Sequence, residues 1–121
     1  NINENSIDLI LSNAVMEHVV ELESAYSNMY KWLKPGGYCS HQIDYRAHEL
    51  SNIWYQHWEY SDLIWKILMH GRKYAINRMP HSAHKQLMIN AGFEIIKEIK
   101  NKDKLHSIHT ILYKKKKKKN E

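Results

Sequence analysis

The chain has 121 residues, of which 43% are hydrophobic and 26% are charged, and its formal net charge is +5. This length suits one domain of ordinary size. Four Gly, two Pro and a single Cys exclude collagen-like, low-complexity and disulfide-scaffold proteins. No apolar run approaches the roughly 20 residues of a membrane span, and no signal-peptide pattern opens the chain. We therefore expect a cytoplasmic protein.

The positive charge comes from one short segment. Six lysines follow one another from Lys114 to Lys119, whereas residues 1–113 carry 12 basic and 12 acidic side chains. We expect residues 114–121 to form a solvated, Lys-rich tail, because chain ends are commonly disordered. A lysine run can also attract nucleic acid or anionic lipid. The chain has only three arginines, the side chains that most often make bidentate contacts with bases, so no specific nucleic-acid partner is expected.

The first third of the chain alternates between strand and helix patterns. Residues 6–12 form an apolar run bounded by polar residues, which is typical of a buried parallel strand. From Glu21 to Leu33 the apolar residues recur at intervals of three and four, which predicts an amphipathic helix. Residues 34–37 contain Pro and two Gly and end that helix. Residues 38–43 then predict a second strand, and the βαβ crossover should be right-handed.

Aromatic residues concentrate in the middle of the chain. Residues 45–80 contain three of the four Trp and four of the eight Tyr. Ser61 predicts the N-cap of a helix. The apolar face of that helix would comprise Leu63, Ile64, Ile67 and Leu68. We expect this helical insertion either to extend the core, as aromatic stripes usually do, or to form the lid of a pocket.

The last third returns to regular patterns. Ser82 predicts the N-cap of a helix that ends at Ala91, with Gly92 as a left-handed stop and Leu87 and Met88 facing inward. Residues 93–100 and 107–114 are rich in β-formers, and the polar linker between them suits an antiparallel hairpin. The whole order predicts an α/β fold with a helical insertion and an antiparallel edge.

Two motifs carry a family resemblance. Residues Ser6–Val19 contain a strand pattern followed by Glu-His, and Leu33–Gly37 read Leu-Lys-Pro-Gly-Gly. Together they resemble class I S-adenosylmethionine-dependent methyltransferases, in which these features run from the fourth strand to the fifth. Ala91–Glu94 looks like the family's later turn into the sixth strand. His41–Asp44 and Asn77-Arg78 look like a bacterial subgroup associated with methylation of surface glycans or small molecules.

The resemblance implies the C-terminal part of a Rossmann-like methyltransferase sheet, with a terminal antiparallel β-hairpin. Residues 1–113 would be a partial methyltransferase domain, with residues 45–80 as its substrate-side insertion. The implied methyl donor is S-adenosylmethionine, and the implied acceptor is a small molecule or a sugar. The family holds its cofactor mainly through a Gly-x-Gly loop, whereas Gly occurs here only at positions 36, 37, 71 and 92. We therefore expect the main cofactor-binding half to be lacking.

That expectation has a consequence for the first strand. Without an upstream half of the sheet, residues 6–12 would form a bare apolar edge. Such an edge is prone to self-association.

The resemblance places Asn13 and Ala14 beside the methionine part of the cofactor. They follow a parallel strand at its C-terminal end, where ligands of α/β sheets gather. The alternative is a plain strand-to-loop turn. Glu17 and His18 are candidate catalytic residues, because an imidazole titrates near neutrality and can accept a proton from an acceptor hydroxyl. The alternative is a structural or cofactor-shell role, since methyl transfer often needs little beyond alignment.

A set of polar residues near the end of the second strand provides candidate substrate ligands: His41, Asp44, Tyr45, Arg46 and His48. They would line a polar pocket or bond the adjoining loop. No metal site is expected, because the pairs His81/His84 and His106/His109 have no cysteine partner. Gly36 and Gly37 follow a helix rather than precede one, so they predict a turn and not a phosphate loop.

A different class of function stays open at this point. The chain would then be a non-enzymatic α/β binding module whose lysine tail contacts nucleic acid or a membrane. An upstream coding sequence with a strand followed by Gly-x-Gly would favour the enzyme.

Overall fold

The computed structural model describes residues 1–46, 58–71, 76–100 and 108–118. Within them four strands form one mixed sheet in the order β1-β2-β4-β3. The strands are β1 (Ile7–Asn13), β2 (Leu33–Asp44), β3 (Phe93–Lys100) and β4 (Ile108–Lys115). β1 pairs with β2 in parallel, and β4 pairs antiparallel with β2 and with β3. The predicted α/β fold and the C-terminal hairpin are confirmed.

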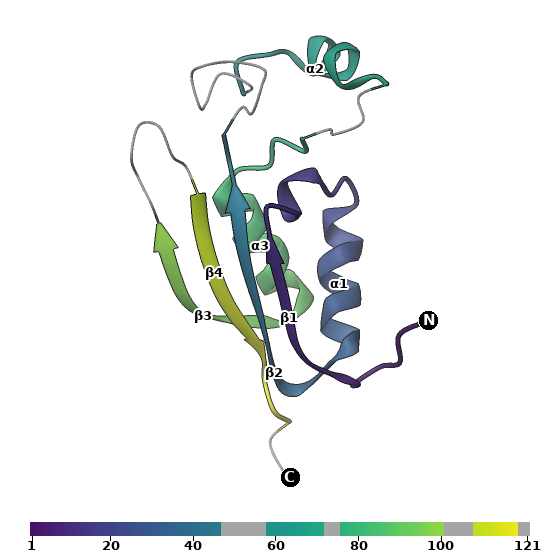
Figure 1. Cartoon of the computed structure of the whole chain (residues 1–121), viewed down its shortest axis with the longest axis vertical. Helices are drawn as coiled ribbons and strands as arrows, with labels where there is room; N and C mark the ends of the chain where they lie inside the picture. Colours follow the sequence, from purple (N-terminus) through teal and green to yellow (C-terminus); the bar gives the residue numbers. More distant parts are fainter. Residues whose placement is uncertain (47–57, 72–75, 101–107, 119–121) are drawn as a thin grey trace.

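Helices lie on one face of this sheet. α1 (Leu22–Trp32) and α3 (His81–Ala91) pack against it, and the short 3-10 helix η1 (Met16–His18) follows β1. α2 (Asp62–Met69) belongs to the insertion and lies beyond the C-terminal ends of β1 and β2 (Figure 1). None of the described helices combines the length and the apolar character needed to cross a membrane.

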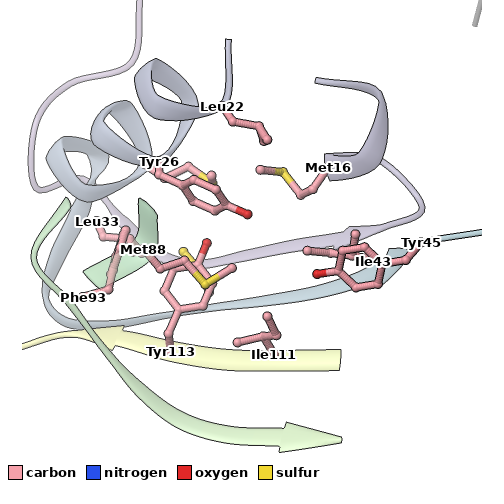
Figure 2. Close-up of a cluster of buried hydrophobic side chains, with 12 residues drawn as sticks. Met16, Leu22, Tyr26, Leu33, Ile43, Tyr45, Met88, Phe93, Ile111 and Tyr113 are labelled. Atoms are coloured by element: carbon pink, nitrogen blue, oxygen red, sulfur yellow. The ribbon is translucent and has the colours of Figure 1, made fainter. Parts of the chain in front are cut away.

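The hydrophobic core lies between the sheet and the helices α1 and α3. Tyr26 of α1 and Met88 of α3 are fully buried, and both lie close to Tyr113 of β4 (Figure 2). The rings of Tyr26 and Tyr113 meet edge to face with centroids 6.3 Å apart. Burial of each large apolar side chain stabilises a fold by about 1.5–3 kcal/mol, so this layer is the main source of stability.

The opposite face of the sheet carries no helix among the described residues. Leu9 and Tyr38 are exposed there, and Leu11 keeps 67% of its surface accessible. β1 also lies at the edge of the sheet, so one side of its backbone has no strand partner in the described part of the chain. Within the described residues β1 is therefore an edge strand beside an exposed apolar face, and self-association through it stays a prediction.

β2 begins earlier than the sequence predicts. α1 ends at Trp32 and β2 starts at Leu33 rather than at residue 38. Leu33 pairs with Ile7 while Tyr38 pairs with Leu9, so the intervening residues of β2 form an irregular turn. Gly36 has φ of 85°. A Cβ at Gly37 would lie 2.9 Å from the carbonyl oxygen of Lys34. The two glycines are therefore required by a positive φ and by a close backbone approach.

In the insertion, the structure confirms the predicted helix cap at Ser61 but not the predicted burial of the apolar face of α2. The Ser61 side chain accepts a hydrogen bond from the Ile64 N–H at 3.3 Å. The predicted apolar face is mostly exposed, since Leu63 keeps 69% of its surface accessible and Ile64 and Ile67 are exposed as well. Trp65 is the buried residue of α2. In the described residues α2 therefore adds little to the core.

α3 begins earlier than the sequence predicts. Its N-cap is Pro80, without a side-chain hydrogen bond, so the predicted cap at Ser82 is wrong.

The C-terminal elements extend slightly beyond their predicted ends. Gly92 ends α3 with φ of 108°, as expected. β4 runs to Lys115, so the first two lysines of the predicted tail belong to a strand. The Lys115 ammonium donates to the carbonyls of Tyr30 at 2.8 Å and Leu33 at 3.0 Å. These contacts satisfy carbonyl groups that the end of α1 leaves open.

Candidate active site

The C-terminal end of β1 is exposed and has an unusual backbone. Asn13 ends the strand and Ala14 follows it with φ of 54°, a left-handed conformation. The Ala14 N–H donates to the Gln42 carbonyl at 2.9 Å, which ties this turn to β2. A left-handed non-glycine residue costs free energy, and such strain gathers at functional sites. Asn13 and Ala14 lie at the C-terminal end of the strand, the position that the sequence predicts for them.

Glu17 and His18 lie on the short helix η1 directly after this turn. The His18 N–H donates to the Val15 carbonyl at 3.0 Å, and the Val19 N–H donates to the Met16 carbonyl at 3.4 Å. Glu17 keeps only 2% of its surface accessible, whereas His18 is half-buried. The two neighbours therefore differ in access, and His18 is the one within reach of solvent.

A carboxylate and a guanidinium form a compact pair at the end of β2. The buried Asp44 carboxylate accepts from the backbone N–H of Arg46 at 3.0 Å, from its Nε at 2.8 Å, and from its Nη2. Hydrogen bonding to Asp44 raises the pKa of Arg46, and the charges of Asp44 and Glu17 add to this. Glu17 therefore lies within electrostatic reach of a permanent positive charge, which offsets part of the cost of burying a carboxylate.

Tyr45 begins a polar chain that reaches the surface. Its buried hydroxyl bonds His81 Nδ1 at 3.1 Å, and His81 Nε2 lies 3.4 Å from a Glu98 carboxylate oxygen. Lys85 pairs with the same carboxylate at 2.8 Å. Burial raises the pKa of Tyr45, and Tyr26, Glu17 and Glu98 raise it further. Tyr45 is therefore a neutral hydrogen-bonding group at physiological pH.

His41, a predicted substrate ligand, lies in the core. It keeps 1% of its surface accessible, its Nδ1 bonds Ser12 Oγ at 2.6 Å, and its Nε2 bonds the Tyr113 hydroxyl. Burial lowers the pKa of His41 to about 4. Both ring nitrogens are thus bonded to protein groups, which leaves neither of them for a substrate. His48 lies outside the described residues.

Sequence reasoning missed one residue of this region as a site residue. The Asn77 side-chain amide donates to the carbonyls of Met16 at 2.8 Å and Val19 at 2.7 Å, and its backbone N–H donates to the Glu17 carbonyl at 2.8 Å. Asn77 thus holds η1 on both sides. The one available signal was the Asn-Arg pair in the sequence, which carries no indication of a contact with residues 60 positions upstream.

Two hollows adjoin the η1 region. The lining of one includes residues that follow η1 in the sequence, and the lining of the other includes residues that precede it. A cavity of about 620 Å³ is lined by residues of α2, of the start of α1, and of α3. Its lining includes Val20, Leu22, Trp65, Met69, Asn77 and Leu87. A shallower hollow of about 390 Å³ on the open face of the sheet reaches Asn13 and Gln42. Both volumes are in the range of small-molecule sites.

The structure thus brings Asn13, Ala14, Glu17, Tyr45 and the Asp44–Arg46 pair to one end of the sheet. Among the described residues, no group of three or more His, Cys, Asp or Glu side chains is arranged to hold a metal ion. The arrangement offers an exposed strand end, an accessible imidazole and buried charges that fix the backbone around them.

Comparison with known proteins assigns this chain to a family. The sequence profile of a family described as "Methyltransferase domain" matches residues 3–98, a segment that contains η1 and every predicted site residue. The chain belongs to this methyltransferase family. A search of curated proteins found no match for this methyltransferase chain.

Solved methyltransferases share the fold. An S-adenosylmethionine-dependent methyltransferase from Mesorhizobium loti has a TM-score of 0.69 and 13% identity, over 93% of this chain and 63% of its own. One from Methanosarcina mazei has a TM-score of 0.70 and 14% identity, over 97% of this chain and 63% of its own. Phosphoethanolamine N-methyltransferase 2 from Haemonchus contortus, solved with S-adenosylmethionine, has a TM-score of 0.67 and 14% identity, over 97% of this chain and 35% of its own.

These matches show the fold and its extent. The methyltransferase chain described here spans less than two thirds of the length of each of these structures. The fold is thus that of part of a methyltransferase domain, in agreement with the partial domain that the resemblance implies.

Proposed function

We propose that this chain is part of a longer enzyme that transfers a methyl group from S-adenosylmethionine to a small-molecule or sugar acceptor. The observation that carries the proposal is the η1 turn. In a segment matched by the methyltransferase family, it holds Glu17 and His18 at the C-terminal end of a parallel strand.

The chain fits one end of the cofactor. Asn13 and Ala14 are exposed at the end of β1, beside a hollow of about 390 Å³. They would hold the methionine end, and the bound cofactor would supply an activated methyl group on a sulfonium. No Gly-x-Gly sequence is present to hold the rest of the molecule. We infer that a further segment, packed against β1 and the open face of the sheet, completes the site.

The side chains around η1 would orient the acceptor. His18 is accessible, so it would accept a proton from an acceptor hydroxyl or hold that hydroxyl by a hydrogen bond. Glu17 is buried and would fix the turn, with Arg46 as its nearby cation. Arg46 is partly exposed and would provide a polar contact, with Asp44 holding its guanidinium and Tyr45 supporting the site from the core. Alignment of the acceptor would account for most of the rate.

The test uses the longer protein, expressed with its upstream coding sequence, and S-adenosylmethionine labelled in the transferred methyl group. Transfer is measured to a panel of sugars and small hydroxylated molecules. We expect His18→Ala to lower turnover more than it weakens cofactor binding. The loss should stay below the roughly 10²- to 10⁴-fold that general acid–base catalysis contributes. Asn90→Ala, on the exposed side of α3, is the control and should leave turnover unchanged.

One result would change the role of His18, and another would refute the function itself. Weaker cofactor binding with intact turnover would assign His18 to the cofactor shell instead. Absence of both cofactor binding and methyl transfer in the longer protein would refute the proposed function.

A further inference from the structure

The segment after the insertion contacts two separate parts of the molecule through adjacent residues. Asn77 makes the first set of contacts. Its amide donates to the carbonyls of Met16 and Val19 at 2.8 and 2.7 Å, and these two residues bracket Glu17 and His18. Its backbone N–H donates to the Glu17 carbonyl at 2.8 Å. Three hydrogen bonds from one residue therefore hold the η1 turn.

Arg78 makes the second set, on the insertion. Its Nη1 donates to the Tyr60 carbonyl at 2.6 Å, its Nη2 pairs with Asp62, and its guanidinium lies 4.9 Å from the ring centroid of Trp65. Its own carbonyl accepts from Trp58 Nε1 at 2.7 Å. Arg78 is thus joined to the start of α2 and to the residues just before it.

The backbone at Arg78 is strained, and this conformation lets Asn77 contact η1 while Arg78 contacts the insertion. Arg78 has φ of 43°, in the left-handed region that non-glycine residues rarely adopt. The Asn77 side-chain oxygen accepts from the Met79 N–H at 3.0 Å, which closes a local turn around Arg78. The cost of this conformation is offset by contacts on two sides, which is the usual condition for such strain to persist.

We propose that Asn77 and Arg78 form a clasp that makes the η1 turn and α2 open and close as one unit. Asn77 is then a positioning residue for Glu17 and His18. The lining of the cavity of about 620 Å³ includes Val20, next to the η1 turn, Trp65 of α2 and Asn77 itself. The clasp therefore sets the spacing of its walls.

Only the role of Asn77 as a positioning residue for Glu17 and His18 rests on the proposed function. The mechanical coupling is a property of the chain itself. It can be tested on the 121-residue chain without cofactor or acceptor.

The experiment is amide hydrogen exchange resolved to single residues. Asn77→Asp keeps the acceptor oxygen but removes both side-chain donors. We expect the His18 and Val19 amides, which are bonded within η1, to exchange about tenfold faster, because two hydrogen bonds to the turn are lost. The α2 amides of Trp65 and His70 should speed up with them. Amides of β2 should not change.

Arg78→Ala tests the coupling from the other side. It should accelerate exchange in α2 and, through the clasp, at His18 and Val19 by at least about threefold. Asn90→Asp, an Asn-to-Asp change on the exposed side of α3, is the matched control and should alter neither segment. Asp62→Asn should have a smaller effect than Arg78→Ala, because Arg78 keeps its bond to the Tyr60 carbonyl.

A second measurement needs no variant. Native-state exchange of the unchanged chain in low concentrations of urea should give the η1 and α2 amides the same opening free energy and the same urea dependence. Acceleration confined to α2 in Arg78→Ala, no change at His18 in Asn77→Asp, or separate opening of the two segments in urea would each overturn the proposal. A methyltransferase assay on the longer protein fails or succeeds independently of these results.

Discussion

Two histidines of this domain are held away from water as neutral hydrogen-bonding groups. His84 is fully buried and its Nδ1 bonds the Tyr26 hydroxyl at 2.8 Å, while His41 bonds Ser12 and Tyr113. Burial lowers the pKa of both to about 4, and for His84 the neighbouring His81 and His41 add to this. An unfolded chain would protonate them near pH 6.5. Their burial therefore links stability to pH.

Stability should fall as the pH is lowered from 7.5 to 5. The folded pKa lies below the unfolded pKa, so the unfolded state binds more protons between about pH 6.5 and 4 and gains stability there. Each buried histidine should lower the free energy of unfolding by about 2 kcal/mol at pH 5 relative to pH 7.5. Urea unfolding at the two pH values, followed by circular dichroism, measures this difference.

His84→Gln isolates one of the two histidines. It retains a polar partner for Tyr26 but cannot titrate, so the pH-dependent loss should shrink by about half. His70→Gln, at an exposed position, should leave the pH dependence unchanged. A free energy of unfolding that is flat or rises toward pH 5 would contradict the assignment of neutral, buried histidines.

Part of this residue-level arrangement was predictable from the sequence. His41 alternates with Cys39 and Ile43 along β2, and side chains at intervals of two share a face, so the pattern contained the inward position of His41. The burial of Glu17 beside an exposed Ala14 follows from no local pattern. The contact of Asn77 with η1 depends on how the chain returns to the sheet after the insertion. A single sequence contains no local pattern that predicts such a contact.

At the scale of elements, the end of α1 depends on a residue from the far end of the chain. The Lys115 ammonium donates to two carbonyls at the end of α1 and to the Asn5 side chain at 2.9 Å. It also lies 4.4 Å from the centroid of the Tyr30 ring. Positive charge near a helix C-terminus is favourable and its hydrogen bonds satisfy open carbonyls.

Lys115→Met should therefore destabilise the fold. The change keeps most of the aliphatic stem and removes the donors, and we expect a loss of about 1–2 kcal/mol in the free energy of unfolding. Lys116→Met, one position further along and exposed, is the matched control and should have almost no effect. Equal effects of the two substitutions in urea titrations would argue against a structural role of Lys115.

Because Lys115 belongs to β4, only the lysines after it are expected to be dispensable for stability. Removal of residues 116–121 should leave the thermal midpoint almost unchanged, because β4 ends at Lys115. The same deletion should abolish any salt-sensitive binding to a polyanion such as heparin, since residues 1–113 carry equal numbers of basic and acidic side chains. Binding that survives the deletion would reveal a basic face on the domain itself.

The regular elements were predictable where local signals agree. β3 has its predicted bounds, and Gly92 ends α3, because alternation and a left-handed glycine are both local features. The start of β2 was not, since it depends on the pairing of Leu33 with Ile7 across the sheet. The orientation of α2 was also beyond the sequence. Its strong apolar face predicts burial, yet Trp65 from another side of the helix is the residue that packs.

At the scale of the whole molecule, the sheet is covered on one face only within the described residues. Leu9, Leu11 and Tyr38 are exposed on the other face, next to the free edge of β1. An apolar surface beside an unpaired strand edge favours association with other chains.

We expect the isolated chain to self-associate with rising concentration. Leu11→Lys should weaken this association and leave the thermal midpoint nearly unchanged, because the side chain is mostly solvated in the monomer. Leu63→Lys, at a comparably exposed position on α2, is the matched control and should leave association intact. Sedimentation velocity over a range of concentrations distinguishes these outcomes. A chain that stays monomeric throughout, or equal effects of the two substitutions, would contradict a role for the open face.

We propose that this methyltransferase chain contributes one end of a cofactor site and that a further segment completes the site. Calorimetric titration with S-adenosylmethionine tests it most directly. The 121-residue chain alone should give no saturable heat at micromolar concentrations, because it has Asn13 and Ala14 at the strand end but no Gly-x-Gly loop. The longer protein should bind one equivalent. A clean one-site isotherm with the 121-residue chain in the micromolar range would show instead that this chain holds the whole cofactor by itself.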